Sequence, residues 1–359
     1  MPSIASARTI RTVSLSWRSD SVAESIPSPE AAPAPLDRRE ALLRILRLAG
    51  LSAGTAAAGY WLSTRSLRPA EKLAAGGRRS HAIAADPNLP ELTVVHGGEP
   101  RQLVQRALGE LGGIQRFISR GDVVIVKPNI AWDRTPEQAA NTNPELVAEV
   151  VRQCWSAGAK KVIVTDVSCN DPRRCFPRSG IENAARGEGA EVLLPDPSRF
   201  KEVDLGGDIL QAWPVYQPFL EADKIINLPI AKHHSLTGCT LGMKNWYGIL
   251  GGQRHRLHQR IHESLVDLAD FMRPTLTMID SYRVLLRNGP TGGNLEDVLL
   301  KKTLVAGTDP VALDAYVAKA YWNLDSAALP YLKMAVDRGL GSLQFEKLRT
   351  QVVALDAST

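Results

Sequence analysis

From about Glu91 onward, short runs of β-branched and other apolar residues alternate with longer stretches of helical periodicity. The short runs predict strands at residues 92–95, 122–126, 161–165, 191–194, 224–228, 276–279 and 303–306. The longer stretches predict helices at residues 101–111, 143–157, 257–272, 310–322 and 330–339. This alternation predicts an α/β fold with a mostly parallel open sheet and helices on both faces, in a single large domain after a disordered leader.

The first 90 residues differ from this pattern. Residues 1–36 are rich in Ser, Ala, Pro and Arg without apolar periodicity, which is typical of a disordered segment. Arg38 and Arg39 then precede an uncharged, weakly apolar stretch at 48–64, a pattern that resembles a twin-arginine export signal. We therefore expect a disordered leader, a signal or membrane anchor, a linker and an α/β domain, in that order. Their respective bounds are 1–36, 37–66, 67–90 and 91–356.

An export signal would make the twin-arginine machinery a partner and place the domain at the periplasmic face of a bacterial cell envelope. The sequence leaves open whether the leader is cleaved or stays as a transmembrane anchor. A short amphipathic helix at the start of the domain is the alternative to export. The disulfide state of Cys169 and Cys175 also depends on export, because the two thiols can pair in an oxidising compartment and stay free in the cytosol.

Composition narrows the class of protein. The chain has 359 residues, of which 44% are hydrophobic and 23% charged, and this excludes a collagen, a coiled coil and a wholly disordered chain. Residues 1–90 contain 12 Lys and Arg against 7 Asp and Glu, whereas the remaining residues contain 31 of each. The basic surplus therefore lies outside the predicted domain, which argues against nucleic acid as a partner.

Polar residues follow several of the predicted strands, where open parallel sheets bind their ligands. They are Lys127, Asn129, Asp166, Lys232, His233, His234, Asp280 and Asp309. Capping is the ordinary role of such residues, and Asp309 fits it because Pro310 follows. Lys127 and Lys232 make poor caps, so these strand ends favour a binding site.

Residues 225–252 carry the most informative pattern, IINLPIAKHHSLTGCTLGMKNWYGILGG. Its Pro-x-x-Lys-x-His, Leu-Thr-Gly and Lys-Asn steps resemble the DUF362 family, a domain of unassigned function that is sometimes joined to iron–sulfur modules. The matching positions here are Pro229, Lys232, His234, Leu236, Thr237, Gly238, Lys244, Asn245 and Gly248. Others are the Lys-Pro-Asn at 127–129, His258, residues 273–276 with Asp280, the loop at 288–293, and 306–310 with Asp314.

The residue types at these positions suit a small anionic ligand and acid–base chemistry. The ligand-binding residues that we predict are Lys127, Asn129, Asp166, Asn245, His258, Gly289, Gly292 and Gly293. The residues that we predict for catalysis are Lys232, His234, Lys244 and Asp280. Lysines and amides attract an anion, and a glycine loop can present backbone N–H groups to it.

Two of the predicted catalytic roles need particular environments. His234 would act as a general acid or base near neutral pH, oriented by Asp280 or Asp166. A buried lysine beside other cations has a lowered pKa and would serve as a base or a Schiff-base nucleophile. The structural alternative is that Lys244 and Asn245 cap a helix and that the histidines are hydrogen-bonded core groups.

A divalent metal is the rival chemistry, and the cofactor stays open. His255, His258 and His262 are spaced to share one helix face, where His234 or Asp280 would complete a site. The four cysteines are scattered singly, so an internal ferredoxin-type cluster is not expected. The leading hypothesis is therefore an enzyme acting on a small anionic molecule by Lys/His acid–base chemistry. The alternatives are a non-catalytic envelope protein that binds a ligand, a metal or a redox partner.

Overall fold

The computed structural model describes Asp37, Arg39 and residues 80–355. The chain divides into compact units at 1–68 and 69–359, and the following concerns the second unit. The expected disordered leader and nearly all of the expected signal or anchor at 37–66 lie outside the described residues. Within the described part of the chain, no helix is long and apolar enough to cross a membrane. Residue 81, expected in the linker, packs on the domain, because the backbone N–H of His81 donates to the carbonyl of Arg273.

The centre of the domain is a ten-stranded sheet in the order β12-β1-β11-β10-β7-β2-β3-β4, with β8 and β9 attached beside β10. Its strands are β1 (Leu92–His96), β2 (Val123–Pro128), β3 (Lys161–Thr165), β4 (Glu191–Leu193), β7 (Lys224–Leu228), β8 (Ile230–His234), β9 (Gly238–Thr240), β10 (Leu276–Leu285), β11 (Val298–Gly307) and β12 (Thr350–Ala354). A separate hairpin consists of β5 (Phe200–Asp204) and β6 (Ala212–Tyr216). The pairs that involve β11 and the β8–β9 pair are antiparallel, and the others in the large sheet are parallel. The prediction of a mostly parallel α/β sheet is thus confirmed.

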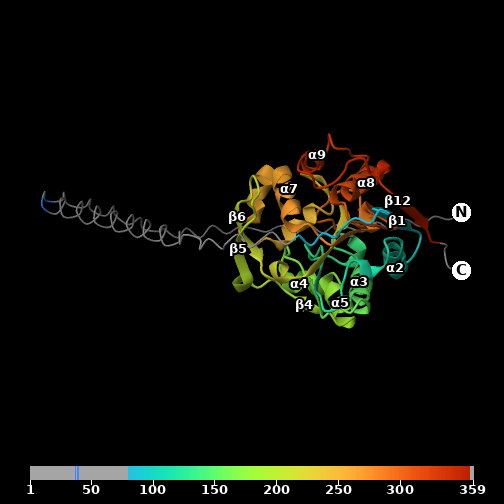
Figure 1. Ribbon diagram of the computed structural model, residues 1–359. Helices are drawn as coiled ribbons and strands as arrows, with labels where there is room; N and C mark the ends of the chain where they lie inside the picture. The colour runs from blue at the N-terminus through green and yellow to red at the C-terminus, as the bar shows by residue number, and fades with distance from the viewer. Residues whose placement is uncertain (1–36, 38, 40–79, 356–359) are drawn as a thin grey trace, which may run out of the picture. The chain divides into compact units, whose positions relative to one another are not determined.

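Helices cover both faces of the sheet (Figure 1). One face carries α2 (Pro100–Glu110), α3 (Pro144–Ser156), α4 (Pro172–Arg178) and α5 (Ile181–Gly187), and the other carries α7 (Ile261–Met272), α8 (Pro310–Trp322) and α9 (Pro330–Asp337). The short α6 (Pro218–Glu221) precedes β7. Successive strand residues point to opposite faces. Accordingly, Val124 and Val126 of β2 join the core under α3, whereas Ile125 joins the core under α7 and α8.

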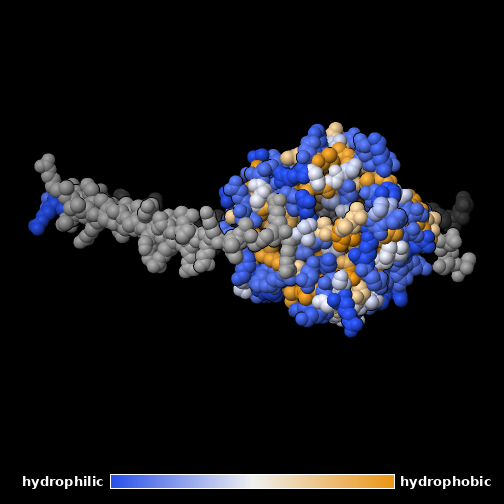
Figure 2. All heavy atoms as spheres, viewed as in Figure 1, coloured by the Kyte–Doolittle hydropathy of each residue, from blue (hydrophilic) through white to orange (hydrophobic). Residues whose placement is uncertain are grey.

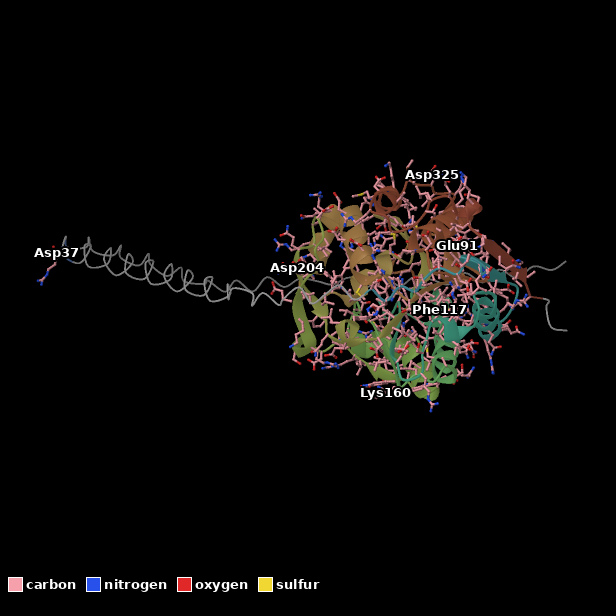
Figure 3. All side chains as sticks on the ribbon, in the orientation of Figure 1. Asp37, Glu91, Phe117, Lys160, Asp204 and Asp325 are labelled. Carbon is pink, nitrogen blue, oxygen red and sulfur yellow. The ribbon has the colours of Figure 1, made fainter. Side chains whose placement is uncertain are left out.

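Apolar side chains fill the interior of the domain, and charged side chains lie on its surface. Phe117 lies in the core, while Lys160 and Asp325 project at opposite outer ends of the domain (Figure 3). The surface in the view of Figure 2 is mainly hydrophilic, with apolar residues emerging in several places.

Two helices begin where the sequence predicts. Asn143 caps α3 by accepting a hydrogen bond from the backbone N–H of Glu145, and Pro144 is the first helical residue. Asp309 caps α8 in the same way through the backbone N–H of Ala312, which confirms its expected capping role.

Two of the predicted boundaries that differ from the structure affect the site. The strand predicted at 276–279 continues to Leu285, because residues up to Leu285 pair with β11. The helix predicted from 257 begins at Ile261, because Arg260 leaves the helical region with φ −130° and ψ 53°. The preceding segment η5 (Arg254–Arg260) is a 3-10 helix.

Candidate functional site

A cavity of about 890 Å³ opens beyond the carboxyl ends of β2, β3 and β8, against η4 (Lys244–Ile249) and η5. Of the predicted site residues, it is lined by Asn129, Asp166, Lys232, His234, Lys244, Asn245 and His258. Lys127 lies directly behind it, in contact with Asp166. Segments more than a hundred residues apart in the chain therefore meet at one end of the sheet, where parallel strands generally hold ligands.

Lys127 and Asp166 form a buried ion pair at the base of the site. The ammonium of Lys127 donates to Asp166 Oδ1 at 2.7 Å, and Asp166 Oδ2 accepts from the backbone N–H of Ile130 at 2.6 Å. Burial lowers the pKa of Lys127, and the charge of Asp166 opposes that shift. Gly248 makes the pair possible, because a Cβ there would lie 1.9 Å from Asp166 Oδ1. The two charges compensate each other, so the pair is a structural element of the site.

Lys232 has a different environment, although its side chain is only 1% exposed. Its Nζ donates to Asn129 Oδ1 at 3.0 Å and to the carbonyl oxygen of Ala140 at 2.5 Å, both of which are uncharged acceptors. Burial, together with the positive charges of Lys244 and Lys127, lowers the pKa of Lys232 to about 7. A neutral amine in this position uses both of its hydrogens in these two bonds and keeps its lone pair free.

Asn129 belongs to a chain of side-chain amides that runs beneath the cavity. Asn129 Nδ2 donates to Asn245 Oδ1 at 3.0 Å, and Asn245 Nδ2 donates to Asn227 Oδ1 at 2.8 Å. Asn227 Nδ2 then donates to the carbonyl oxygen of Gly242 at 2.9 Å. Sequence reasoning missed Asn227, although one polar residue within the buried apolar run of β7 is a signal that could have identified it.

Lys244 contributes a buried cation to the wall of the cavity. It is 8% exposed, and among the residues that the structure describes its Nζ has neither a carboxylate nor a hydrogen-bond partner. Nζ lies 4.8 Å from the centre of the Tyr247 ring. Burial lowers the pKa of Lys244 to about 8, so it is mostly protonated at neutral pH. An unpaired ammonium in a cavity wall attracts an anion.

Asp314 of α8 fixes the turn that leads to Lys244. Its carboxylate accepts hydrogen bonds from the backbone N–H groups of Gly242 at 2.7 Å and Met243 at 3.1 Å, and from the hydroxyl of Tyr331 at 3.2 Å. Burial raises the pKa of Asp314 to about 7, and these donors act against that rise. The position of Lys244 therefore depends on a helix about seventy residues further along the chain.

His234 lines the cavity as a neutral ring. Burial and the charges of Lys244 and Lys232 lower the pKa of His234 to about 2, so the ring stays neutral near pH 7. The sequence had instead predicted a histidine that titrates near neutral pH. Its Nδ1 accepts from the backbone N–H of Leu236 at 3.1 Å, which leaves the ring hydrogen on Nε2. The ring stacks on His258, with ring centres 6.3 Å apart.

Asp280 lies outside this site. Its carboxylate accepts from the backbone N–H groups of Asn143 at 2.7 Å and Tyr282 at 2.9 Å, and it is not among the cavity-lining residues. The reason is the length of β10, which places Asp280 in the middle of the strand instead of at its end. It therefore does not orient His234.

The glycine loop is also positioned differently from the prediction. The N–H of Gly289 donates to His233 Nδ1 at 3.1 Å and is not available to a ligand. The carbonyl of Gly293 accepts from Gln138 at 3.0 Å, and that of Gly292 accepts from Arg134 at 3.5 Å. None of the three glycines lines the cavity, whereas neighbouring Pro290 does.

The histidines predicted to share a helix face are separated by the break at Arg260. His258 in η5 stacks on His234, whereas His262 in α7 stacks on Tyr331. Among the described residues, no three His, Cys, Asp or Glu side chains lie close enough together to hold a metal ion. Cys169 and Cys175 are free thiols, of which Cys169 lines the cavity.

Arg254 connects two walls of the cavity. Its Nη1 donates to the carbonyls of Val167 at 2.7 Å and Tyr247 at 2.9 Å, and its Nη2 donates to that of Ser168 at 2.6 Å. These bonds join the loop after β3 to η4. Sequence reasoning also missed the apolar wall of Trp132 and Phe200, because neither residue lies in a recognisable motif.

Fold and site together define an α/β protein with a cation-lined cavity at the carboxyl ends of its strands. The family described as "Domain of unknown function (DUF362)" matches residues 124–319, so the chain belongs to the DUF362 family. The chain is also similar to thylakoid-associated protein sll1697 of Synechocystis sp., with 28% identity over 242 residues that cover 65% of this chain and 73% of that protein. Among solved structures it is similar to the lactate racemase apoprotein of Thermoanaerobacterium thermosaccharolyticum, with 14% identity and a TM-score of 0.35. That match covers 62% of this chain and 55% of the racemase chain, so this chain spans about half of it.

Proposed function

We propose that the protein is an enzyme that binds a small anionic molecule in the cavity and uses Lys232 as a general base. The observation that carries this proposal is the hydrogen bonding of Lys232, whose two bonds go to the neutral acceptors Asn129 and Ala140. A neutral Lys232 amine satisfies both acceptors and directs its lone pair elsewhere. After taking a proton from the substrate, it becomes an ammonium that keeps both bonds.

The same geometry favours a base over a Schiff-base nucleophile. An imine nitrogen carries no hydrogen and an iminium nitrogen carries one, so a Schiff base on Lys232 would deprive at least one of the two buried acceptors of its donor. Leaving a buried carbonyl unpaired costs about 1–3 kcal/mol. Proton abstraction has no such cost.

The charges around the cavity support an anionic substrate. Lys232, Lys244 and Arg254 line it, and Asp166, the single lining carboxylate among the described residues, is paired with Lys127. In the proposed mechanism the ammonium of Lys244 binds the anionic group, and the Nε2–H of His234 donates to a polar atom of the substrate. Lys232 then removes a proton held between these groups.

Competitive labelling of amines across a pH series tests the proposed base without a known substrate. The modification rate of Lys232 should have a midpoint near pH 7, because its pKa is lowered to about 7. Exposed Lys160 in the same sample is the control for the reactivity of the reagent at each pH. A midpoint for Lys232 near the value of about 10.4 that is usual for lysine would contradict the proposed role.

Isothermal titration with acetate and inorganic phosphate tests the anion site. Both anions should bind the wild-type protein, and Lys244→Met should abolish binding. A Lys160→Met variant should bind as the wild type does. Anion binding that survives Lys244→Met would place the anion elsewhere and contradict the proposal.

A non-catalytic ligand-binding protein is the second candidate, and the rigid amide chain under Lys232 is the observation that favours it. This role predicts that Lys232→Met retains anion affinity and that no tested compound is turned over.

We also propose that the protein is exported and associated with a membrane of the cell envelope. The paired arginines at 38 and 39 support this location, and so does the description of the Synechocystis relative as thylakoid-associated. Cell fractionation of the wild type and of an Arg38→Lys/Arg39→Lys variant tests it. Loss of the envelope fraction in the variant alone is the expected result, and equal fractionation of the two would refute export by this route.

A further inference from the structure

The two lysines of the cavity lie at its bottom, and its mouth combines apolar side chains with the exposed polar residues Ser235 and His255. Lys232 and Lys244 are 1% and 8% exposed, whereas Leu236 at the rim is 60% exposed. Trp132 and Phe200, which also line the cavity, are half-buried. An ordinary protein surface has the opposite order, with apolar groups inside and charges outside. A ligand that fits this gradient enters with its charge first and leaves an apolar part against the rim.

The size of the cavity points to the same kind of ligand. Its volume of about 890 Å³ lies within the range of about 300–1000 Å³ that is typical of sites for drug-sized molecules. An anion of two or three carbon atoms would occupy a small part of this space around Lys244. The remainder, lined by Trp132, Phe200 and Leu236, would be filled only by a longer molecule.

The apolar wall is built into the fold. The ring of Phe200 packs against Tyr216 with ring centres 5.1 Å apart. Gly251, another lining residue, leaves the room for this ring, because a Cβ at that position would lie 2.5 Å from Phe200 Cδ1. The backbone of Gly251 accepts a hydrogen bond from the indole of Trp213 at 3.1 Å and donates one to the carbonyl of Pro214 at 2.8 Å. These contacts fix Phe200, the part of the apolar wall that lies beside Gly251, next to the end of the η4 segment.

We infer that the ligand is an amphipathic anion, with a carboxylate or phosphate group at Lys244 and an extended apolar body against Trp132, Phe200 and Leu236. This inference rests on the proposed anion site and adds the substrate class. Removal of apolar surface from water supplies binding energy along the wall, and the ammonium of Lys244 supplies orientation.

A chain-length series tests the inference by calorimetry. The probes are acetate, hexanoate, octanoate and decanoate below their aggregation concentrations, with octyl phosphate as the second headgroup and octanol as the uncharged control. Affinity should rise with each methylene, up to about fourfold where the methylene is fully buried. Octanoate or octyl phosphate should bind more tightly than octanol, and the tighter of these two identifies the headgroup.

Two matched variants locate the apolar part. Leu236→Ser should weaken decanoate binding several-fold and leave acetate binding unchanged, because only the longer chain reaches the rim. Leu300→Ser is the control, since Leu300 is 54% exposed and does not line the cavity. It should change neither affinity.

The outcomes separate this inference from the proposed function. Equal affinities for acetate and decanoate, with Lys244-dependent binding of both, would overturn the amphipathic ligand and leave the anion site intact. Absence of binding by every anion, or binding of octanoate and octyl phosphate that is no tighter than binding of octanol, would overturn the anion site and this inference with it. Equal effects of Leu236→Ser and Leu300→Ser would also overturn the inference, because the chain would then lie outside the cavity.

Discussion

Lys127 and Lys244 are both buried lysines at the same end of the sheet, and they differ in what faces them. Lys127 meets the carboxylate of Asp166 at 2.7 Å, so the two charges cancel. Lys244 faces the ring of Tyr247 and the cavity, without an anion among the described residues. Burial of a charge is costly unless the charge is paired. The comparison suggests that the first lysine holds the site together and that the second is kept available for a ligand.

Removal of one partner of the buried pair should have the largest effect on stability. Asp166→Asn leaves Lys127 buried without its counter-charge, and it should lower the free energy of unfolding by about 3–5 kcal/mol. Urea denaturation measures the change. Lys127→Met combined with Asp166→Asn should recover most of the loss, because no charge is left unpaired and the amide oxygen at position 166 can still accept from the backbone N–H of Ile130. If Asp166→Asn were as stable as the wild type, the buried pair would not hold the site together and the contrast between Lys127 and Lys244 would be wrong.

A methyl group at Gly248 should have the next largest effect. The added Cβ would lie 1.9 Å from Asp166 Oδ1 and 2.6 Å from Lys127 Nζ, so the pair must separate. We expect a loss of about 1–3 kcal/mol. Gly109→Ala is the control, because that helical glycine has no neighbour within 4 Å of the added Cβ and should be neutral or stabilising.

Lys244→Met should raise stability by about 1 kcal/mol near pH 7, since it removes an unpaired buried charge. The pKa of Lys244 is lowered to about 8 from the ordinary lysine value of 10.5, so between these pH values the folded state binds fewer protons than the unfolded state. The stability of the wild type therefore rises with pH across this window, and the advantage of the variant should disappear above it. Thermal unfolding at pH 7 and pH 10.5 measures both effects. An advantage that is equal at the two pH values would contradict the assignment.

The smallest expected effect concerns His234, which we expect not to titrate near neutral pH. The His234 ring should give no protonation step between pH 5 and pH 8 in a nuclear magnetic resonance titration, because burial, Lys244 and Lys232 lower its pKa to about 2. Lys244→Met should raise the midpoint. A wild-type midpoint near 6.5 would mean that the two lysines do not act on this ring as their positions require.

The sequence predicted the sheet and most strand ends, because buried parallel strands are short apolar runs that end in polar residues. Lys127, Asp166 and Lys232 were found in this way. Asp280 was misplaced because the length of β10 depends on pairing with β11, which is a contact between distant segments. The hairpin of β5 and β6 and the terminal strand β12 were missed. β5 and β12 are short and mostly exposed, and β6 contains Pro214, which argues against a strand.

The roles within the site were less predictable than its members. The resemblance in residues 225–252 identified Lys244, but its position follows from Asp314, which binds the preceding turn from another helix. The neutral state of His234 depends on the lysines around it, and the residue type alone does not reveal those neighbours. The apolar lining residues Trp132, Phe200 and Leu236 come from three separate segments that share no sequence pattern.

The chain of asparagine amides has a fixed direction, from Lys232 through Asn129, Asn245 and Asn227 to the carbonyl of Gly242. Rotation of any one amide by half a turn would bring oxygen against oxygen on one side and nitrogen against nitrogen on the other, so the three amides keep or lose their orientation as a unit. The chain presents an oxygen to position 232. A side chain that donates a hydrogen satisfies this oxygen, whereas an ionised carboxylate at position 232 would face it oxygen against oxygen. The asparagines therefore disfavour an ionised acidic residue at the centre of the site.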